Sequence, residues 1–300
     1  MSDSLERLRS KISRGRQLGS VVHAMKTLAA VRIGQFEQAT RSLDRYMRNV
    51  KRGLSVCLRS GPRLPEVEHE ATEVAAVVLG SDEGLVGRFN ETVLEYARSV
   101  LPGGGKAARV WVVGERLATS FAEHAVPYEQ VLAVPSSVEA ISPLVADVLG
   151  YLERWRSAHP ASAVYLLFNR FEGGDSFQPV HERLLPFGAQ WARTFAEIEW
   201  PTHNLPEPVG PTERLLEALI REYLFGSLFR ACAESIASEN ASRLAAMQRA
   251  ERNIDSLVES LELARNGLRQ AAIDEELFDV IAGFEALTAA RPVKREDGRA

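Results

Sequence analysis

The sequence predicts an α/β fold in which a long helix at each end of the chain pairs as an antiparallel coiled coil, with a Rossmann-like αβ domain and a mainly parallel sheet between them. Residues 4–58 and 212–290 contain no proline, and their apolar residues recur at three- and four-residue steps. Between them, short valine-rich runs alternate with helix-like stretches, which favours parallel strands joined by crossover helices. The expected boundaries are 1–60 and 212–290 for the coiled-coil helices, 67–200 for the αβ domain and 291–300 for a flexible tail.

The N-terminal helix is predicted from a regular apolar stripe. If it is continuous, it is about 80 Å long, well beyond the span of a small domain. Gly15, Gly19 and Gly34 each cost it roughly 1 kcal/mol relative to alanine, so we expect a partner helix to stabilise it. The stripe consists of Leu5, Leu8, Ile12, Val22, Met25, Ala29, Phe36, Ala39, Leu43, Met47, Val50 and Leu54.

The middle of the chain reads as alternating strands and helices. The runs "EVAAVVLG", "ARVWVVGE" and "SAVYLLFNRF" are typical of strands buried on both faces, and "FQPVHERLLP" follows a glycine turn as an added hairpin strand. "PGGGK" lacks the P-loop spacing and is interpreted as a flexible turn. The helices expected between the strands cover residues 87–100, 116–123 and 138–158.

The second long helix begins after the proline-rich connector "PTHNLPEPVGP". From Thr212 it could reach about 115 Å, and the simplest way to bury its stripe is against the N-terminal helix. The two helices differ in charge. The segment before residue 60 contains thirteen Lys and Arg residues and four Asp and Glu residues. Residues 212–290 contain eight Lys and Arg residues and fourteen Asp and Glu residues. Two interpretations stay open: mutual pairing with solvated faces, or an acidic partner facing basic groups such as Lys26, Arg32, Arg41 and Arg45.

No residue pattern indicates a catalytic, cofactor or metal site. The glycines of "VVLGSDEGLVGRFN" are not spaced G-x-G-x-x-G, and Cys57 and Cys232 form no metal-ligand pair. The opening lacks a secretory signal and no apolar run could span a membrane, so the chain is expected to start at Met1 and stay cytoplasmic. The competing interpretations are a dinucleotide-binding enzyme using the middle domain and a nucleic-acid binder using the basic helix.

Four motifs resemble the gamma subunit, or central stalk, of rotary F-type ATP synthases. The stretch "SENASRLAAMQRAERNIDSLVESLELARNGLRQAAIDEELFDVIAGFEAL" is similar to that family's C-terminal signature. "HAMKTLAAVRI" resembles its N-terminal Ala-Met-x-Met-Val-Ala-Ala-x-Lys pattern. "SDEGLVGRFN" is similar to its Ser-Asp-x-Gly-Leu-Cys-Gly-x-x-Asn turn, and "LLFNRFEGGDSFQPVHERLLP" to its later strand pair. The matches follow the family's order across nearly the whole chain.

The resemblance implies a non-catalytic rotor without a cofactor of its own. In that family the coiled coil stands inside a hexamer of alternating alpha and beta subunits, and the middle domain binds epsilon and sits on the c-ring. The implied location is the cytoplasmic face of the bacterial inner membrane, with peripheral association through the complex and no nucleic-acid partner.

The resemblance also implies which residues contact the hexamer. Arg269 and Gln270 match the family's Arg-Gln pair that contacts the beta lever region, and Glu276 matches its nearby glutamate. Asp274 replaces a hydroxyl residue beside that pair. The facing N-terminal segment is matched by Met25, Lys26 and Arg32.

Departures from the family pattern suggest a variant branch, which we treat as a hypothesis. Val86 stands where cysteine is common, and "GRQLGSVVHAM" lacks the usual Thr-x-x-Ile-Thr approach. These departures would fit an alternative or a sodium-linked ATP synthase. If the c subunit of the same operon lacks the glutamate and hydroxyl residues that bind sodium, the sodium-linked enzyme is ruled out.

Overall fold

The computed structural model describes residues 2–60, 73–174, 176–200, 202, 204–207 and 209–289. Its internal contacts divide the chain into two compact units. The sheet unit is Met25–Met247, and the paired-helix unit combines Met1–Ala24 with Gln248–Ala300. The division therefore falls inside the two long helices and not at their ends. Residues 67–72 of the expected αβ domain and the expected tail 291–300 lie outside the described residues.

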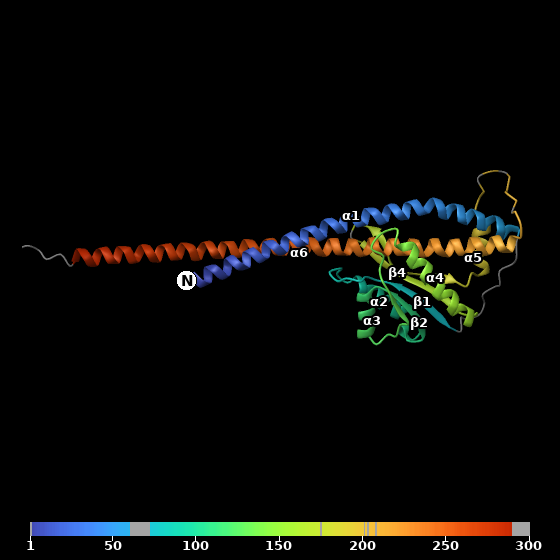
Figure 1. The fold of residues 1–300 in the computed structure, drawn as a ribbon, viewed down its shortest axis with the longest axis horizontal. Helices are drawn as coiled ribbons and strands as arrows, with labels where there is room; N and C mark the ends of the chain where they lie inside the picture. The colour runs from blue at the N-terminus through green and yellow to red at the C-terminus, as the bar shows by residue number, and fades with distance from the viewer. Residues whose placement is uncertain are drawn as a thin grey trace, which may run out of the picture. The chain divides into compact units, whose positions relative to one another are not determined.

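Both predicted long helices are present and continuous. Helix α1 spans Ser2–Ser60 and helix α6 spans Thr212–Ala289 (Figure 1). Within the sheet unit they pair antiparallel, since Asp44 forms an ion pair with Arg230 whereas Gly53, later in α1, packs against Leu219, earlier in α6. The pairing predicted from the apolar stripes is thus confirmed in this unit.

Glycine in these helices permits close packing. A Cβ atom added at Gly226 of α6 would lie 2.0 Å from the sulfur of Met47, a buried α1 side chain. By contrast, a Cβ added at Gly34 of α1 would meet nothing within 4 Å. Close packing at Gly226 therefore offsets the helix-propensity cost of glycine. At Gly34 no such packing contact with the described residues offsets that cost.

We expect Gly226→Ala to lower the free energy of unfolding by about 1–3 kcal/mol, because displacing a buried methionine outweighs the roughly 1 kcal/mol that alanine adds to helix propensity. The matched Gly34→Ala variant should gain up to about 1 kcal/mol. Urea denaturation of the isolated chain measures both. Equal effects from the two substitutions would contradict this packing account.

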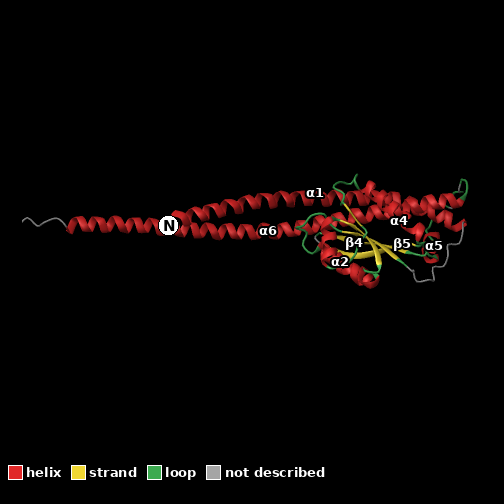
Figure 2. Cartoon of the chain, turned by 60° about the horizontal axis from the view of Figure 1, so that its bottom comes forward, coloured by secondary structure: helices red, strands yellow, loops and turns green. Residues whose placement is uncertain are grey.

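The sheet unit is built on one five-stranded sheet of order β3-β2-β1-β4-β5. Figure 2 shows the strands of this sheet in yellow, with β4 and β5 labelled. The first four strands in this order run parallel, and β5 pairs antiparallel with β4, which confirms the predicted added hairpin strand. The strands are β1 (Val74–Leu79), β2 (Ala108–Val113), β3 (Gln130–Leu132), β4 (Ala163–Gly173) and β5 (Ser176–Leu185).

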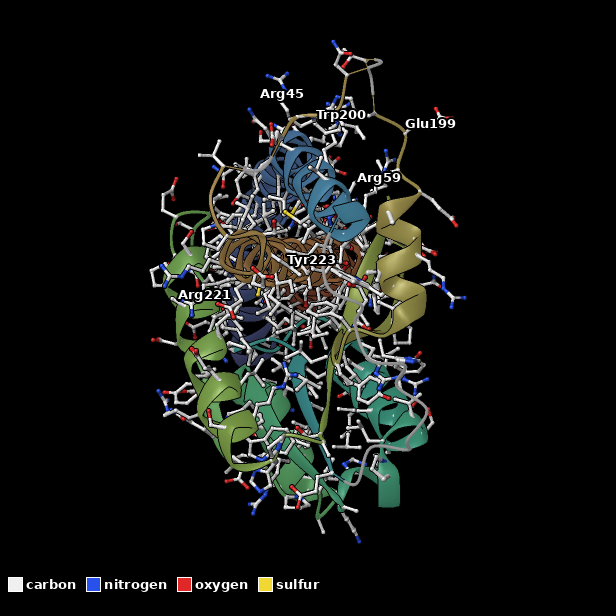
Figure 3. The ribbon with its side chains drawn as sticks, turned by 90° about the vertical axis from the view of Figure 1, so that its right-hand side faces the viewer. Arg45, Arg59, Glu199, Trp200, Arg221 and Tyr223 are labelled. Carbon is white, nitrogen blue, oxygen red and sulfur yellow. The ribbon has the colours of Figure 1, made fainter. Side chains whose placement is uncertain are left out.

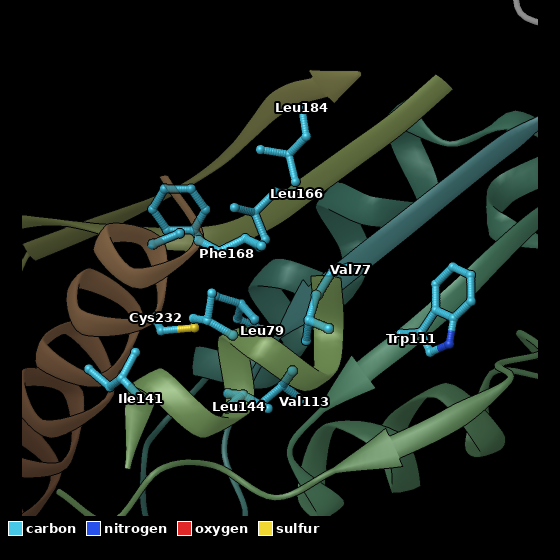
Figure 4. Packing of buried hydrophobic residues seen from close by; sticks show 14 of the residues in the cluster. Val77, Leu79, Trp111, Val113, Ile141, Leu144, Leu166, Phe168, Leu184 and Cys232 are labelled. Carbon is cyan, nitrogen blue, oxygen red and sulfur yellow. The ribbon is translucent and has the colours of Figure 1, made fainter. Parts of the chain in front are cut away.

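Helices cover both faces of this sheet. Alternate β1 residues enter different cores: Val77 packs with residues of α4 and α6, whereas Val78 packs with residues of α2 and α3. Figure 4 shows the first core, where Cys232 of α6 and Ile141 of α4 lie near Leu79. The covering helices are α2 (Phe89–Val100), α3 (Glu115–Glu123) and α4 (Ile141–Ala158).

Three short elements were missed by sequence reasoning. Strand β3 has only three residues, too few for an alternating pattern. Helix α5 (Ala189–Ala196) packs its aromatic side chains against Tyr223 of α6, so its stability comes from tertiary contacts. The predicted flexible turn "PGGGK" forms a 3₁₀ turn, Pro102–Gly105, in which Gly103 and Gly104 adopt positive φ.

Candidate interaction surfaces

In the paired-helix unit the two helices also run antiparallel. Arg16 of α1 contacts Glu262 of α6 at 2.5 Å, and His23, later in α1, contacts Glu251, earlier in α6, at 3.2 Å. The helices approach closely at Gly15, where an added Cβ would lie 2.8 Å from Val258. Gly15, which the sequence presents only as a cost, therefore marks a contact point between the helices.

The predicted contact residues of the α6 end are all exposed. Arg269, Gln270, Asp274 and Glu276 lie on the helix surface of the paired-helix unit. They extend a part of α6 in which most side chains are exposed from Leu263 onward. Exposure of these residues is what a partner-binding surface requires.

The predicted contact residues of α1 belong to the sheet unit. Met25 and Lys26 are half-buried, and Arg32 is exposed. Arg32 acts on Glu239 of α6: burial raises the pKa of that carboxyl, and the Arg32 charge is among the smaller influences that lower it. Arg32 therefore has a neighbour within its own chain as well as an exposed surface.

The two predicted groups belong to different units, the Met25 group to the sheet unit and the Arg269 group to the paired-helix unit. In the paired-helix unit His23 faces Glu251, and Arg269 lies 18 residues further along α6, which corresponds to about 27 Å of helix. Met25, Lys26 and Arg32 therefore form one candidate surface within the sheet unit, and the Arg-Gln pair forms another within the paired-helix unit.

An exposed apolar surface at the α6 end was not singled out from the sequence. Five large apolar side chains there are between 46% and 69% exposed. The available signal was the apolar pattern that continues to the end of α6. These side chains are Ile273, Leu277, Phe278, Val280 and Ile281.

Helix α1 also exposes large apolar side chains. Leu18 and Val21 do so in the paired-helix unit, and Leu28 and Val31 do so in the sheet unit, each more than half exposed. Exposed apolar groups at helical spacing are a sign of protein contact surfaces. Both long helices therefore carry exposed apolar side chains that are suited to contacts with partner proteins.

The glycine turn after β1 is filled by its own side chains. The Asp82 carboxylate accepts hydrogen bonds from the backbone N–H groups of Glu115 and Val134, at 3.0 and 2.9 Å. Asn90 accepts from the Ser81 N–H and donates to its hydroxyl. A Cβ on Gly80 would lie 2.5 Å from the Leu117 Cβ. The glycine therefore serves packing, which speaks against a dinucleotide site at this turn.

The same turn is joined to a part of α6 that is buried almost all round. Residues 231–243 are buried except for Glu234, so the helix is not amphipathic there, unlike the simple stripe expected. The Ser242 hydroxyl donates to the Val86 carbonyl, and the Ser238 hydroxyl donates to the Asn169 carbonyl at 2.9 Å. These bonds attach α6 to the sheet from inside the unit.

A buried ion pair lies in the same part of α6. Arg243 donates to Glu239 at 2.6 Å, with side-chain exposures of 7% and 8%. Arg243 also reaches the Asn240 amide oxygen at 3.3 Å. Breaking a buried pair of this kind is strongly destabilising because one charge is left without its partner.

The described residues contain no group of three or more His, Cys, Asp or Glu side chains that could hold a metal ion. Over the same part of the chain, no helix is long and apolar enough to cross a membrane. The surfaces described above, rather than a pocket lined with reactive groups, are the prominent features. They define a protein with two long helices whose exposed charged and apolar side chains are suited to contacts with other proteins.

Comparison with known proteins identifies the family. The family model described as ATP synthase matches residues 4–287, and the chain belongs to this family. ATP synthase gamma chains are among its relatives. The ATP synthase gamma chain of Arthrobacter sp. (strain FB24) is 30% identical over 294 residues, covering 94% of this chain and 97% of the relative. That of Synechococcus sp. (strain JA-2-3B'a(2-13)) is 28% identical over 318 residues, covering 95% and 99%.

Solved structures share the fold. A chain of the Euglena gracilis mitochondrial ATP synthase, in the OSCP/F1/c-ring assembly in rotational state 3, matches with a TM-score of 0.68 and 18% identity over 100% of both chains. A chain of the rotor of the same enzyme in rotational state 1 matches with a TM-score of 0.63, covering 91% of this chain and 100% of that one.

Proposed function

We propose that this chain is the central rotor of a rotary F-type ATP synthase and has no catalytic site of its own. It couples ion-driven rotation of the c-ring to ATP synthesis or hydrolysis at the beta subunits. The observation that carries the proposal is the α6 end: every described side chain in residues 269–281 is exposed except Ala272, which is partly buried. A helix end with exposed arginine, carboxylate and large apolar side chains is suited to binding in a cavity formed by other protein subunits.

The partners follow from the family and the surfaces. The alpha and beta subunits of the hexamer would contact Arg269, Gln270, Asp274 and Glu276 on α6, and Met25, Lys26 and Arg32 on α1. The sheet unit would bind the epsilon subunit and the c-ring. The chain would be held peripherally at the cytoplasmic face of a bacterial plasma membrane, in an enzyme that transports protons or sodium.

The mechanism requires only differential contact. Each beta subunit has open and closed states, and a rotor surface that binds one state better shifts its population toward that state. The α6 end is chemically uneven around its axis, with charged and apolar side chains at neighbouring positions. Turning it therefore presents a different surface to each beta subunit in succession, which couples rotation to the state of the catalytic sites.

The test is co-expression of this chain with the alpha and beta subunits of the same genome, followed by purification and an ATPase assay with and without the chain. The proposal predicts a stable complex whose turnover depends on the chain. A folded chain that never joins the hexamer would contradict it, and the sheet unit should then be screened for ligands.

We expect Arg269→Ala to weaken coupling while leaving the fold intact. The position is exposed, so the unfolding free energy should change by no more than about 0.5 kcal/mol. A lost hydrogen bond between a charged group and a partner is worth about 1.5–3 kcal/mol, so ATP-driven ion transport by the assembled complex should fall roughly tenfold or more.

Arg252→Ala is the control, because Arg252 is an exposed arginine of the same helix and unit. It should leave transport nearly unchanged. Loss of folding in isolated Arg269→Ala protein, or equal transport losses in the two variants, would remove the role assigned to Arg269.

A further inference from the structure

The outer face of α1 in the sheet unit carries three exposed arginines at helical spacing. Arg41, Arg45 and Arg48, here called the arginine ridge, line a shallow hollow of about 360 Å³ with Gln38 and Ser42. Figure 3 shows Arg45 pointing away from α6, on the outer side of α1. The opposite side of the helix holds buried groups such as Met47 and Val50, so the ridge belongs to the free face.

The ridge is only partly neutralised within the chain. Arg41 has one partner, the half-buried Glu37, at 3.3 Å. The nearest acidic residue in sequence, Asp44, is taken by Arg230 of α6. Among the residues that the structure describes, no carboxylate forms an ion pair with Arg45 or Arg48. Like charges at this spacing destabilise a helix, so the ridge has a cost that the isolated chain does not offset.

The chemistry of the ridge selects an anionic group. Side chains three and four residues apart lie on one helix face, about 5–6 Å apart at their Cβ atoms. Guanidinium groups have a planar set of donors that fits carboxylate or phosphate oxygens in pairs. Three of them in a row match a row of carboxylates on another helix or loop.

Membrane and nucleic-acid surfaces fit the ridge less well. Binding at a membrane surface needs large apolar groups beside the basic ones, and Tyr46 is the one large apolar residue strongly exposed among described residues 32–60. The Tyr46 hydroxyl is hydrogen-bonded to Glu222 of α6. Stacking on nucleic-acid bases needs interleaved aromatic residues, and this face offers none besides that tyrosine.

We propose that the arginine ridge docks an acidic segment of a neighbouring subunit, a helix or loop that presents several Asp or Glu carboxylates at a spacing of about 5–6 Å. The inference rests on the proposed function, because it places the chain in a complex with other subunits. It adds a contact surface that neither the Arg269 region nor the Met25 segment includes.

The experiment uses the purified assembled complex with a photo-crosslinking amino acid at Ser42, between the arginines. The expected adduct joins Ser42 to a partner-subunit peptide rich in Asp and Glu, identified by mass spectrometry. The same crosslinker at Thr119, an exposed position on α3, serves as the control and should not capture that peptide.

Charge variants test whether the arginines make the contact. The triple variant Arg41→Gln, Arg45→Gln, Arg48→Gln should lower the adduct yield at Ser42 about tenfold, since each exposed pair contributes little and three act together. The matched variant Arg98→Gln, Arg116→Gln, Arg183→Gln removes the same charge from other exposed positions and should change the yield less than about twofold.

The outcomes separate this inference from the proposed function. A wild-type chain that does not assemble overturns both. An assembled complex in which Ser42 captures lipid, nucleic acid, a peptide without acidic residues or nothing overturns the docking inference alone. Equal losses from the two triple variants also overturn it, because the effect would then be one of net charge.

Discussion

Replacing Arg243 with leucine is expected to lower the free energy of unfolding by about 3–5 kcal/mol at neutral pH. Arg243 and Glu239 are both buried, and their contact at 2.6 Å joins two turns of α6 inside the sheet unit. Without the guanidinium, the Glu239 carboxylate stays in a buried site with no compensating charge at hydrogen-bond distance. Chemical denaturation of the isolated chain at pH 7.5 measures the loss.

The loss should shrink as the pH falls. Burial already raises the pKa of Glu239, against the lowering effect of Arg243. An acid whose pKa is higher in the folded than in the unfolded state binds more protons when folded, so stability rises as the pH drops through that window. Removing Arg243 raises the pKa of Glu239 in the folded state further. The pH range over which protonation of Glu239 stabilises the fold then extends to higher pH. The variant should therefore recover part of its stability between pH 7.5 and pH 5.

Two comparisons make this prediction specific. The double variant Glu239→Gln, Arg243→Leu leaves no buried charge and should be more stable than Arg243→Leu alone. Arg249→Leu removes an exposed arginine of the same helix and should cost less than about 0.5 kcal/mol. A loss below about 1 kcal/mol in Arg243→Leu, or a loss that does not depend on pH, would show that the pair does not stabilise the folded sheet unit.

Replacing Gly114 with alanine is expected to cost about 3 kcal/mol or more. Gly114 follows β2 with φ +116°, a conformation that L side chains rarely adopt, and an added Cβ would lie 2.6 Å from the Ser81 carbonyl oxygen. The position also donates its N–H to Leu132, which ties β3 to the sheet. Backbone strain and the steric clash of the added Cβ would both destabilise this turn, in which the Asp82 carboxylate accepts backbone hydrogen bonds.

Gly84→Ala is the matched control for Gly114→Ala. Gly84 lies in the neighbouring turn, and a Cβ added there would meet nothing within 4 Å. Its substitution should change the unfolding free energy by less than about 1 kcal/mol. Thermal denaturation of both variants decides the matter, and comparable melting temperatures would refute the tight packing inferred at Gly114.

Sequence reasoning predicted the fold well where the signal was long and periodic. Helices α1 and α6 extend over many turns, and strands β1, β2 and β4 are continuous apolar runs buried on both faces. It failed for β3 and α5, whose few residues owe their structure to neighbours rather than to local pattern. Local periodicity carries no information about such contacts.

The candidate contact residues were predicted from the family resemblance more than from local physical features of the sequence. Arg269 and Glu276 are ordinary exposed helix residues, and no local feature distinguishes them from Arg252. The fully surrounded part of α6 was missed because its small residues, such as Ala233 and Ala237, look like a weak stripe when the sheet that covers them is unknown. Burial on all sides is a tertiary property.

The measurement that tests the rotor account most directly is ATP-driven rotation of this chain within an immobilised complex of alpha and beta subunits. The label is attached at Lys106→Cys, an exposed position next to the Pro102–Gly105 turn. Both native cysteines are buried, and burial raises the pKa of Cys232 to about 12, so the introduced thiol is the one expected to react. The account predicts stepwise rotation in one direction that requires ATP. A label that stays fixed while the complex hydrolyses ATP at its normal rate would contradict it.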